Sequence, residues 1–335
     1  MKLKLERALV CFISSFLMVT GSIFGTNHWD TPEKYTARVD SLTLFSNTME
    51  TAVPQTEVYN LIRNHLASPS ADGRKKKVLV LGYDGTRVDT LTTIDPANSA
   101  ITKLSENGYG VISYCGGVNY PRMNTQATST APGWCSMLTG AWADVHGIRR
   151  NMQPKSNDHL TLLTTAVQDG IADSSAFYIS WKGHFSNRLM TYYPEKQYVE
   201  KEGLPVRFVQ ADDDEGTLAN VKNDLAQKDC TDFIFFIMEY VDHVGHSSGF
   251  DVKNKKYVNA FHTADEKALD ILNTLEARET YKQEDWLILI TTDHGGCNLN
   301  HGRCTIQERY TFMFCNKPIL PPQEEPFIIF GAPNR

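Results

Sequence analysis

The chain contains the stretch Val78-Leu79-Val80-Leu81-Gly82-Tyr83-Asp84, a short apolar run that ends in a carboxylate. Two later runs end in the same way, with Asp242 after residues 233–241 and Asp293 after residues 286–292. Because none of the three shows polar alternation, they are predicted to be strands buried on both faces, as in a parallel sheet. The carboxyl ends of parallel strands share one edge, so the three carboxylates should meet in one crevice.

A fourth apolar run and two helical patterns complete the predicted core. The run covers residues 177–181. Residues 258–278 carry apolar side chains at three- and four-residue spacing, which is typical of an amphipathic helix, and a shorter helix is expected over residues 57–66. Alternating strands and helices predict an α/β fold, with a mostly parallel central sheet and helices on both faces.

The composition is that of a globular protein, with 41% hydrophobic and 21% charged residues in 335. The formal net charge is -6, and the one basic run, residues 74–77, adjoins a predicted strand. An acidic chain of this kind is not expected to bind nucleic acid as a dedicated function. Nothing in the sequence implies a stable protein partner.

The N-terminus predicts export. Basic residues are followed by an apolar stretch, so residues 1–25 are interpreted as a signal peptide, with an uncleaved membrane anchor as the alternative. A secreted or otherwise extracytoplasmic protein is therefore expected. Residues 26–76 are predicted to be an N-terminal extension and linker, and residues 77–335 the main folded domain.

Six cysteines follow the predicted signal peptide, an even number that suits oxidising surroundings. We expect at least one disulfide, with Cys297, Cys304 or Cys315 as a partner, because these residues are close in sequence. Free buried thiols are the alternative for Cys135 and Cys230, whose neighbours are apolar.

Histidines accompany the strand-end carboxylates. His246 lies four residues after Asp242, His294 follows Asp293 directly, and His301 comes soon afterwards. A lone aspartate at a strand end is usually a cap or turn residue, but three that recur with histidines indicate a metal site. Carboxylates held close together repel one another unless cations lie between them, and mixed imidazole and carboxylate ligands suit zinc.

The remaining motif is Thr130-Ala131-Pro132-Gly133-Trp134. Thr130 is predicted to be the N-cap of a helix that has Pro132 in its first turn and ends near Gly140. A helix N-terminus also favours a phosphate through its free N–H groups and its dipole. The Thr130 hydroxyl would therefore be well placed to attack a phosphate ester.

In this order the motifs resemble the alkaline phosphatase superfamily, and within it the type I phosphodiesterase and nucleotide pyrophosphatase branch. The resemblance rests on four segments between residues 77 and 301: residues 82–89, residues 130–148 with their Leu-Thr-Gly and His-Gly-Ile motifs, residues 242–246, and Asp293-His294-Gly295 with His301-Gly302. It implies an alkaline phosphatase-like catalytic domain.

The resemblance also implies a two-metal hydrolase of small phosphate esters. One zinc ion would be held by Asp242, His246 and His301. The other would be held by Asp84, Asp293, His294 and Thr130. Manganese is the alternative metal. Thr130 would be the nucleophile and would pass through a phosphothreonine intermediate.

The sequence departs from that branch at one point that affects the substrate. The branch has Asn three residues after the threonine, where this chain has Gly133, so we expect backbone N–H groups or Lys182 to contact the phosphate instead. Thr130 and Trp134 stand where sulfatases need other residues. The alternatives left open are a phosphomonoesterase, a phosphonate or phospholipid hydrolase, and a catalytically silent protein that binds a phosphorylated ligand.

Overall fold

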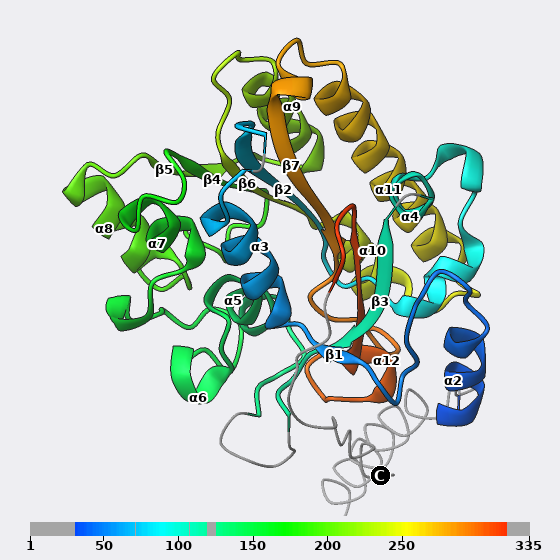
Figure 1. Ribbon diagram of the computed structural model, residues 1–335. Coiled ribbons are helices and arrows are strands. Elements are labelled where there is room, and N and C mark those ends of the chain that lie inside the picture. Colours follow the sequence, from blue (N-terminus) through cyan, green and yellow to red (C-terminus); the bar gives the residue numbers. More distant parts are fainter. Residues whose placement is uncertain (1–30, 71, 107, 119–124, 320–335) are drawn as a thin grey trace, which may run out of the picture.

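The computed structural model describes residues 31–70, 72–106, 108–118 and 125–319, so the predicted signal peptide lies outside the described residues. Its centre is an eight-stranded sheet with the order β1-β3-β8-β7-β2-β6-β4-β5 (Figure 1). Neighbouring strands are parallel, except that β8 is antiparallel to both β3 and β7. The strands are β1 Val53–Pro54, β2 Lys75–Tyr83, β3 Tyr109–Tyr114, β4 Ser175–Ile179, β5 Val206–Gln210, β6 Phe233–Met238, β7 Glu284–Thr291 and β8 Tyr310–Cys315.

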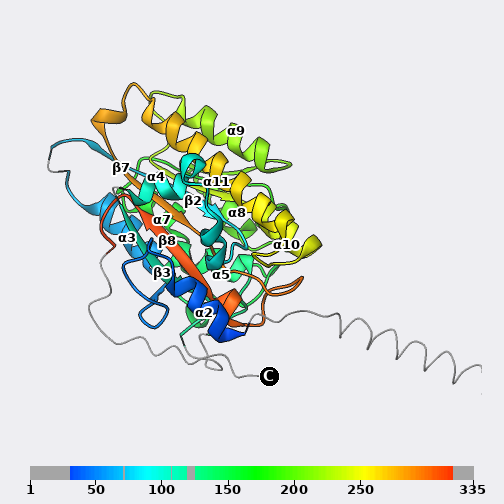
Figure 2. The same cartoon turned by 90° about the vertical axis from the view of Figure 1, so that its right-hand side faces the viewer.

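Helices cover both faces of the sheet, which confirms the predicted fold class. The helices are α2 Pro32–Asp40, α3 Glu57–Ala67, α4 Ala100–Ser105, α5 Thr130–Thr139, α6 Ala143–His146, α7 Leu162–Gln168, α8 Tyr193–Glu202, α9 Asp214–Leu225, α10 Tyr240–Ser248, α11 Lys255–Glu276 and α12 Ile306–Arg309. Buried side chains of α2, α4, α9, α10 and α11 join one core layer, and those of α3, α5, α7 and α8 join the other. Figure 2 shows α9 and α11 lying side by side along one face.

The central strands explain the absence of polar alternation. In β2, Leu79 and Leu81 face the core layer of α11, whereas Val78 and Val80 face that of α5. All four side chains are fully buried. Since successive side chains of a strand point to opposite faces, a strand covered on both sides must be apolar throughout.

Element boundaries follow local signals. The side chain of Asn254 accepts the N–H of Lys256 and caps α11, which therefore begins three residues before the predicted helix. Strand β6 ends at Met238 rather than at Val241, because α10 begins at Tyr240.

Part of the predicted N-terminal extension packs on this sheet. β1 pairs in parallel with β3 and forms an edge of the sheet. Tyr35 of α2 and Ile62 of α3 are fully buried in the two core layers. The described residues before β2 thus share the core of the residues that follow.

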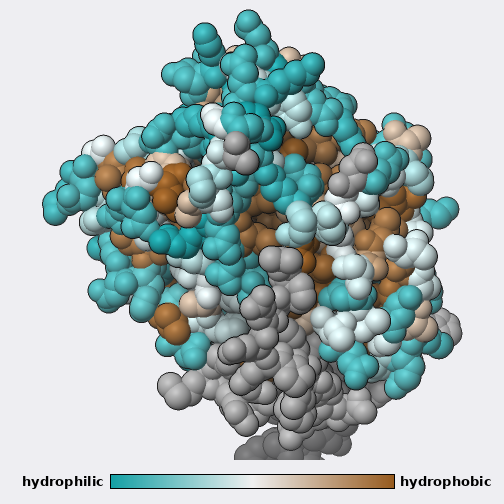
Figure 3. Space-filling model, viewed as in Figure 1, coloured by the Kyte–Doolittle hydropathy of each residue, from teal (hydrophilic) through white to brown (hydrophobic). Residues whose placement is uncertain are grey.

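The surface and the helix lengths complete the description. On the face shown in Figure 3, hydrophilic residues cover most of the upper part, and apolar residues are visible near the centre of the view. Within the described ranges, no helix has both the length and the apolar character needed to cross a bilayer.

Substitution of Gly82 in β2 by a larger residue is expected to lower the stability of the protein. A Cβ atom there would lie 2.5 Å from Cη2 of Trp134, a fully buried residue of α5. Gly82→Ala should therefore lower the free energy of unfolding by about 1–3 kcal/mol through overpacking. Chemical denaturation measures this change. An unchanged denaturation midpoint would show that the indole can move aside, and would contradict the close packing of α5 on β2.

Candidate active site

Three carboxylates meet at the carboxyl edge of the sheet, where β2 lies between β6 and β7. Asp84 follows β2 directly, and Asp293 follows β7 after one intervening residue. Asp242 lies in the first turn of α10 rather than at the end of β6. Gly85 allows the close approach, because a Cβ atom on it would lie 2.5 Å from Oδ1 of Asp242. The convergence expected from the strand pattern is therefore present.

The first group of candidate ligands is buried beside Thr130. Nε2 of His294 lies 3.6 Å from Oδ1 of Asp84 and 3.4 Å from Oδ2 of Asp293. The hydroxyl of Thr130 lies 3.4 Å from Oδ1 of Asp84 and 3.5 Å from Nε2 of His294. One ligand atom from each of Asp84, Asp293 and His294 can lie within 4.8 Å of the others, as a shared metal ion requires.

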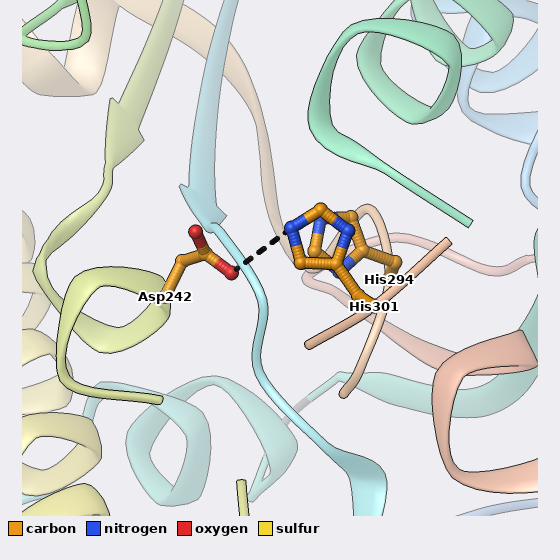
Figure 4. Close-up of side chains that lie close together, drawn as sticks. All are labelled: Asp242, His294 and His301. Atoms are coloured by element: carbon orange, nitrogen blue, oxygen red, sulfur yellow. Dashed lines mark ion pairs between the residues drawn. The ribbon is translucent and has the colours of Figure 1, made fainter. Parts of the chain in front are cut away.

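The second group surrounds Asp242. Nε2 of His246 lies 3.3 Å from Oδ2 of Asp242, one helical turn away on α10. Nε2 of His301 lies 3.7 Å from Oδ1 of the same carboxylate, the pair drawn with a dashed line in Figure 4. Figure 4 also shows His294 beside His301, with ring centroids 4.1 Å apart. His294 therefore lies between the two groups, and the seven predicted ligand residues form one cluster.

The charges in this cluster are unbalanced without cations. Burial raises the pKa of Asp84 well above its ordinary value, and the charges of Asp242 and Glu239 add to the effect. Burial and the charge of Asp84 do the same to the pKa of Asp293. Burial lowers the pKa of His294 to about 3, which leaves the imidazole neutral and able to bind a metal.

Two carboxylate oxygens indicate that metal ions fit this cluster. Oδ1 of Asp242 and Oδ2 of Asp293 are buried and have no hydrogen-bond donor among the described residues. Buried carboxylate oxygens of this kind are normally satisfied. A pair of divalent cations would satisfy both, and the mixture of imidazole and carboxylate donors suits zinc.

Main-chain carbonyls orient the three histidines. Nδ1 of His246 lies 2.9 Å from the carbonyl oxygen of Leu299. Nδ1 of His301 lies 3.0 Å from that of Thr128, and Nδ1 of His294 lies 2.7 Å from that of Gly295. A carbonyl can only accept, so each Nδ1 carries the proton and each Nε2 turns its lone pair toward the carboxylates.

Thr130 is not the N-cap that the sequence predicted. Ser129 precedes the helix, and Thr130 is the first residue of α5. The side chain of Ser129 makes no capping hydrogen bond to this helix, and the Thr130 hydroxyl faces Asp84 and His294. The predicted stop at Gly140 is confirmed by its left-handed conformation.

Asn151 is a site residue that sequence reasoning missed. Its Oδ1 accepts the N–H of Ala131 at 2.9 Å, which uses one of the free N–H groups expected at this helix end. The N–H of Gly133 donates to the carbonyl of Ser129, and Pro132 has no N–H. Because Oδ1 is engaged, Nδ2 is the atom of this side chain that can donate, and Asn151 lines the same cavity as Thr130. The only sequence signal was its place three residues after the His-Gly-Ile motif.

Two adjoining cavities lie above the cluster. One, of about 130 Å³, is lined by Asp84, Thr130, Asn151, Trp181, Glu239, Asp242, His243, His246 and His301. The other, of about 650 Å³, shares Trp181 and His243 with it and holds Lys182, together with Asp212 and Tyr240. Lys182 thus lies beside the cavity of Thr130 rather than in it. His243, Glu239 and Trp181 were not predicted to line the site.

The predicted disulfide is wrong for the described residues. Cys115, Cys135, Cys230, Cys297, Cys304 and Cys315 are all free thiols. Near the loop that carries His301, between β7 and α12, Sγ of Cys115 donates to the carbonyl of Glu308 and Sγ of Cys304 donates to that of Gln126. Burial also raises the pKa of the Cys304 thiol, which disfavours the reactive thiolate.

Comparisons with known proteins agree with this architecture. The family described as type I phosphodiesterase/nucleotide pyrophosphatase matches residues 78–311. A curated relative, ectonucleotide pyrophosphatase/phosphodiesterase 2 of Saccharomyces cerevisiae, is 25% identical over 191 residues, which are 52% of this chain and 38% of the relative.

One solved structure shows the same fold. Murine ectonucleotide pyrophosphatase/phosphodiesterase 5, solved as an inactive variant in complex with AMP, is similar with a TM-score of 0.50 and 18% identity. The match covers 70% of this chain and 59% of that chain. Alkaline phosphatase from the Antarctic bacterium TAB5 matches over 72% of this chain and 91% of its own, with a TM-score of 0.45 and 13% identity. The chain therefore spans 38% of the yeast relative and 59% of the murine one.

We expect the cluster to bind zinc, because two of its buried carboxylate oxygens have no donor among the described residues. Zinc added to chelator-treated protein should bind at about two ions per chain and raise the thermal midpoint, since a ligand at 100 times its dissociation constant stabilises by about 2.7 kcal/mol. Asp293→Asn should lose most of this rise. Asp265→Asn is the matched control, because Asp265 is a buried carboxylate that binds Tyr83 and Ile101 outside the cluster. A midpoint that zinc leaves unchanged would contradict the metal site.

Proposed function

Because this chain belongs to the type I phosphodiesterase/nucleotide pyrophosphatase family of the alkaline phosphatase superfamily, we propose that it is a two-metal hydrolase of phosphate esters with Thr130 as nucleophile. One observation carries the proposal. The Thr130 hydroxyl lies 3.4 Å from Asp84 and 3.5 Å from His294, in the cavity that the candidate metal ligands line. A threonine used only as a cap would have no need of that position.

The proposed ligand sets follow the two groups of side chains. Asp242, His246 and His301 hold one zinc ion, and Asp84, Asp293, His294 and Thr130 hold the other, with manganese as the alternative metal. Bound there, the ions supply positive charge that lowers the pKa of the Thr130 hydroxyl and stabilises the phosphoryl oxygens. Trp134 holds Asp84 in place, since its Nε1 donates to Oδ2 at 2.9 Å.

The chain's own residues then account for the reaction. The Thr130 hydroxyl gives its proton to water, and Oγ1 forms a bond to phosphorus as the bond between phosphorus and the leaving-group oxygen breaks. That oxygen then takes a proton from water. Nδ2 of Asn151 donates a hydrogen bond to a phosphoryl oxygen and so stabilises the charge that develops there. Water then attacks the phosphothreonine from the side that the leaving group left, and restores the Thr130 hydroxyl.

The larger cavity is the place we propose for the leaving group. It shares the lining residues Trp181 and His243 with the cavity of Thr130, and Lys182 lines it. Lys182 is therefore proposed to contact the leaving group rather than the reacting phosphoryl group. A nucleotide is the first substrate to test, because the murine relative was solved with AMP.

The cavity around Thr130 favours a diester over a monoester. None of the described residues that line it is a lysine or an arginine. A monoester dianion would bring an additional negative oxygen that no side chain there neutralises, whereas a diester carries a single charge. A phosphomonoesterase or a phosphonate or phospholipid hydrolase remains the alternative with the same site. A silent phosphate-binding protein is disfavoured, because every proposed ligand position carries a competent residue.

Export remains part of the proposal. It rests on the basic and apolar pattern of residues 1–25. The substrate would then be met outside the cytoplasm, either by a secreted protein or by one anchored through that segment.

The nucleophile is tested by two substitutions. Thr130→Ala should lower kcat/KM by roughly 10³-fold or more, because it removes the attacking atom. Thr130→Ser keeps the hydroxyl and should retain a measurable rate. Neither should change the free energy of unfolding by more than about 1 kcal/mol, since the hydroxyl caps no helix. Hydrolysis by Thr130→Ala at the rate of the unchanged protein would exclude the covalent route.

The substrate preference is tested with matched aryl esters. The diester should have the higher kcat/KM, for the charge reason given above. A monoester advantage of tenfold, about 1.4 kcal/mol of transition-state stabilisation, would reverse the assignment to a phosphatase. Lys182→Ala then tells whether Lys182 supplies the missing positive charge, in which case the monoester rate falls and the diester rate does not.

A further inference from the structure

A buried threonine links the nucleophile segment to one of the proposed metal ligands. Thr128 lies two residues before Thr130, in the segment that enters α5, and only 1% of it is exposed. It does not line the cavity of Thr130 and belongs to neither ligand group. Its bonds nevertheless reach the loop that carries His301.

The hydroxyl of Thr128 makes three hydrogen bonds to that part of the chain. It donates to Oε2 of Glu308 at 2.7 Å. It accepts the N–H of Gly302 at 3.1 Å and the N–H of Cys304 at 3.2 Å. A hydroxyl has one donor and two lone pairs, so its capacity is fully used.

Glu308 extends the same connection. It is fully buried in α12, and its Oε2 also accepts the N–H of Arg303 at 2.7 Å and that of Thr305 at 3.3 Å. The N–H groups of the four consecutive residues 302–305 therefore donate hydrogen bonds either to the Thr128 hydroxyl or to the Glu308 carboxylate that it binds. The loop that follows His301 depends on this pair of side chains.

The main chain of Thr128 acts on His301 itself. Its carbonyl oxygen lies 3.0 Å from Nδ1 of His301. Because the carbonyl can only accept, Nδ1 carries the proton and Nε2 presents its lone pair toward Asp242. The main chain of one residue thus sets the tautomer of a proposed ligand, and its side chain holds the loop in which that ligand lies.

We propose that Thr128, held by Glu308, is a positioning residue that fixes the metal-binding nitrogen of His301 relative to Thr130. The inference rests on the proposed function, because it takes His301 to be a metal ligand. Without the hydroxyl, the N–H groups of Gly302 and Cys304 lose their acceptor and the His301 loop loosens. Groups that orient a metal ligand from behind commonly change metal affinity by about 10–100-fold.

The chain offers a matched control for a purely structural role. Thr164 of α7 is fully buried, and its hydroxyl donates to Oε1 of the buried Glu195 at 2.6 Å. It is the same kind of threonine–glutamate bond, but Thr164 lines neither cavity described above. Thr164→Val should therefore cost stability without affecting zinc.

Competition with a chromophoric chelator measures zinc affinity in the unchanged protein, Thr128→Val, Thr128→Ser and Thr164→Val. Thr128→Val should weaken the binding of one of the two zinc ions by about 10–100-fold. Thr128→Ser keeps the hydroxyl and should restore the affinity, and Thr164→Val should match the unchanged protein. Unaltered zinc affinity in Thr128→Val, or an equal loss in Thr164→Val, would overturn the proposal.

Two readouts without activity or bound zinc keep the inference separate from the proposed function. In zinc-free protein, amide hydrogen exchange of residues 302–304 should be faster in Thr128→Val and unchanged in Thr164→Val. If Thr128→Val does not fold, nitrogen NMR of the unchanged protein tests the main-chain part of the proposal, which requires that His301 carries its proton on Nδ1. A proton on Nε2 would refute the positioning role even if the enzyme hydrolyses esters. If the unchanged protein binds no zinc, the proposed function fails and this inference fails with it.

Discussion

Mutual repulsion among Asp84, Asp242 and Asp293 is the constraint to which the rest of the site is fitted. Three carboxylates are held at one edge of a mostly parallel sheet, and burial and neighbouring carboxylates raise the pKa of Asp84 and of Asp293. Two of the carboxylate oxygens have no donor among the described residues. Among the described residues, the basic side chains within 4 Å of these carboxylates are imidazoles rather than lysines or arginines. A lysine there would have removed the repulsion, but also the affinity for metal ions.

The scaffold keeps these groups from relaxing apart. β2 lies between β6 and β7, so the segments that carry the carboxylates are tied by main-chain hydrogen bonds. Trp134 fits against Gly82 and donates to Asp84, which joins the nucleophile helix to the central strand. Each histidine is held from behind by a carbonyl. Because these groups are already held in place, little reorganisation is needed when a charged phosphoryl group binds.

The pattern of apolar residues predicted the central strands and the longest helix. It did not predict features that depend on partners distant in sequence. β2, β4, β6 and β7 were predictable because their apolar runs lack polar alternation, and α11 because its apolar side chains recur at three- and four-residue spacing. β1 has two residues, and the antiparallel pairing of β8 leaves no mark in the sequence. Asn151 was missed because its role depends on a bond to Ala131. An even number of cysteines suggested a disulfide, although the described thiols are free and those of Cys115 and Cys304 donate to carbonyls.

The central claim is that hydrolysis proceeds through Thr130 in two displacements at phosphorus. Its most direct test is the stereochemical course of hydrolysis of a phosphorothioate diester of known configuration in oxygen-18 water. Each in-line displacement inverts phosphorus, so two in succession should give overall retention. Retention is therefore the result that this account predicts, and inversion, which indicates direct attack of water on the substrate, would contradict it.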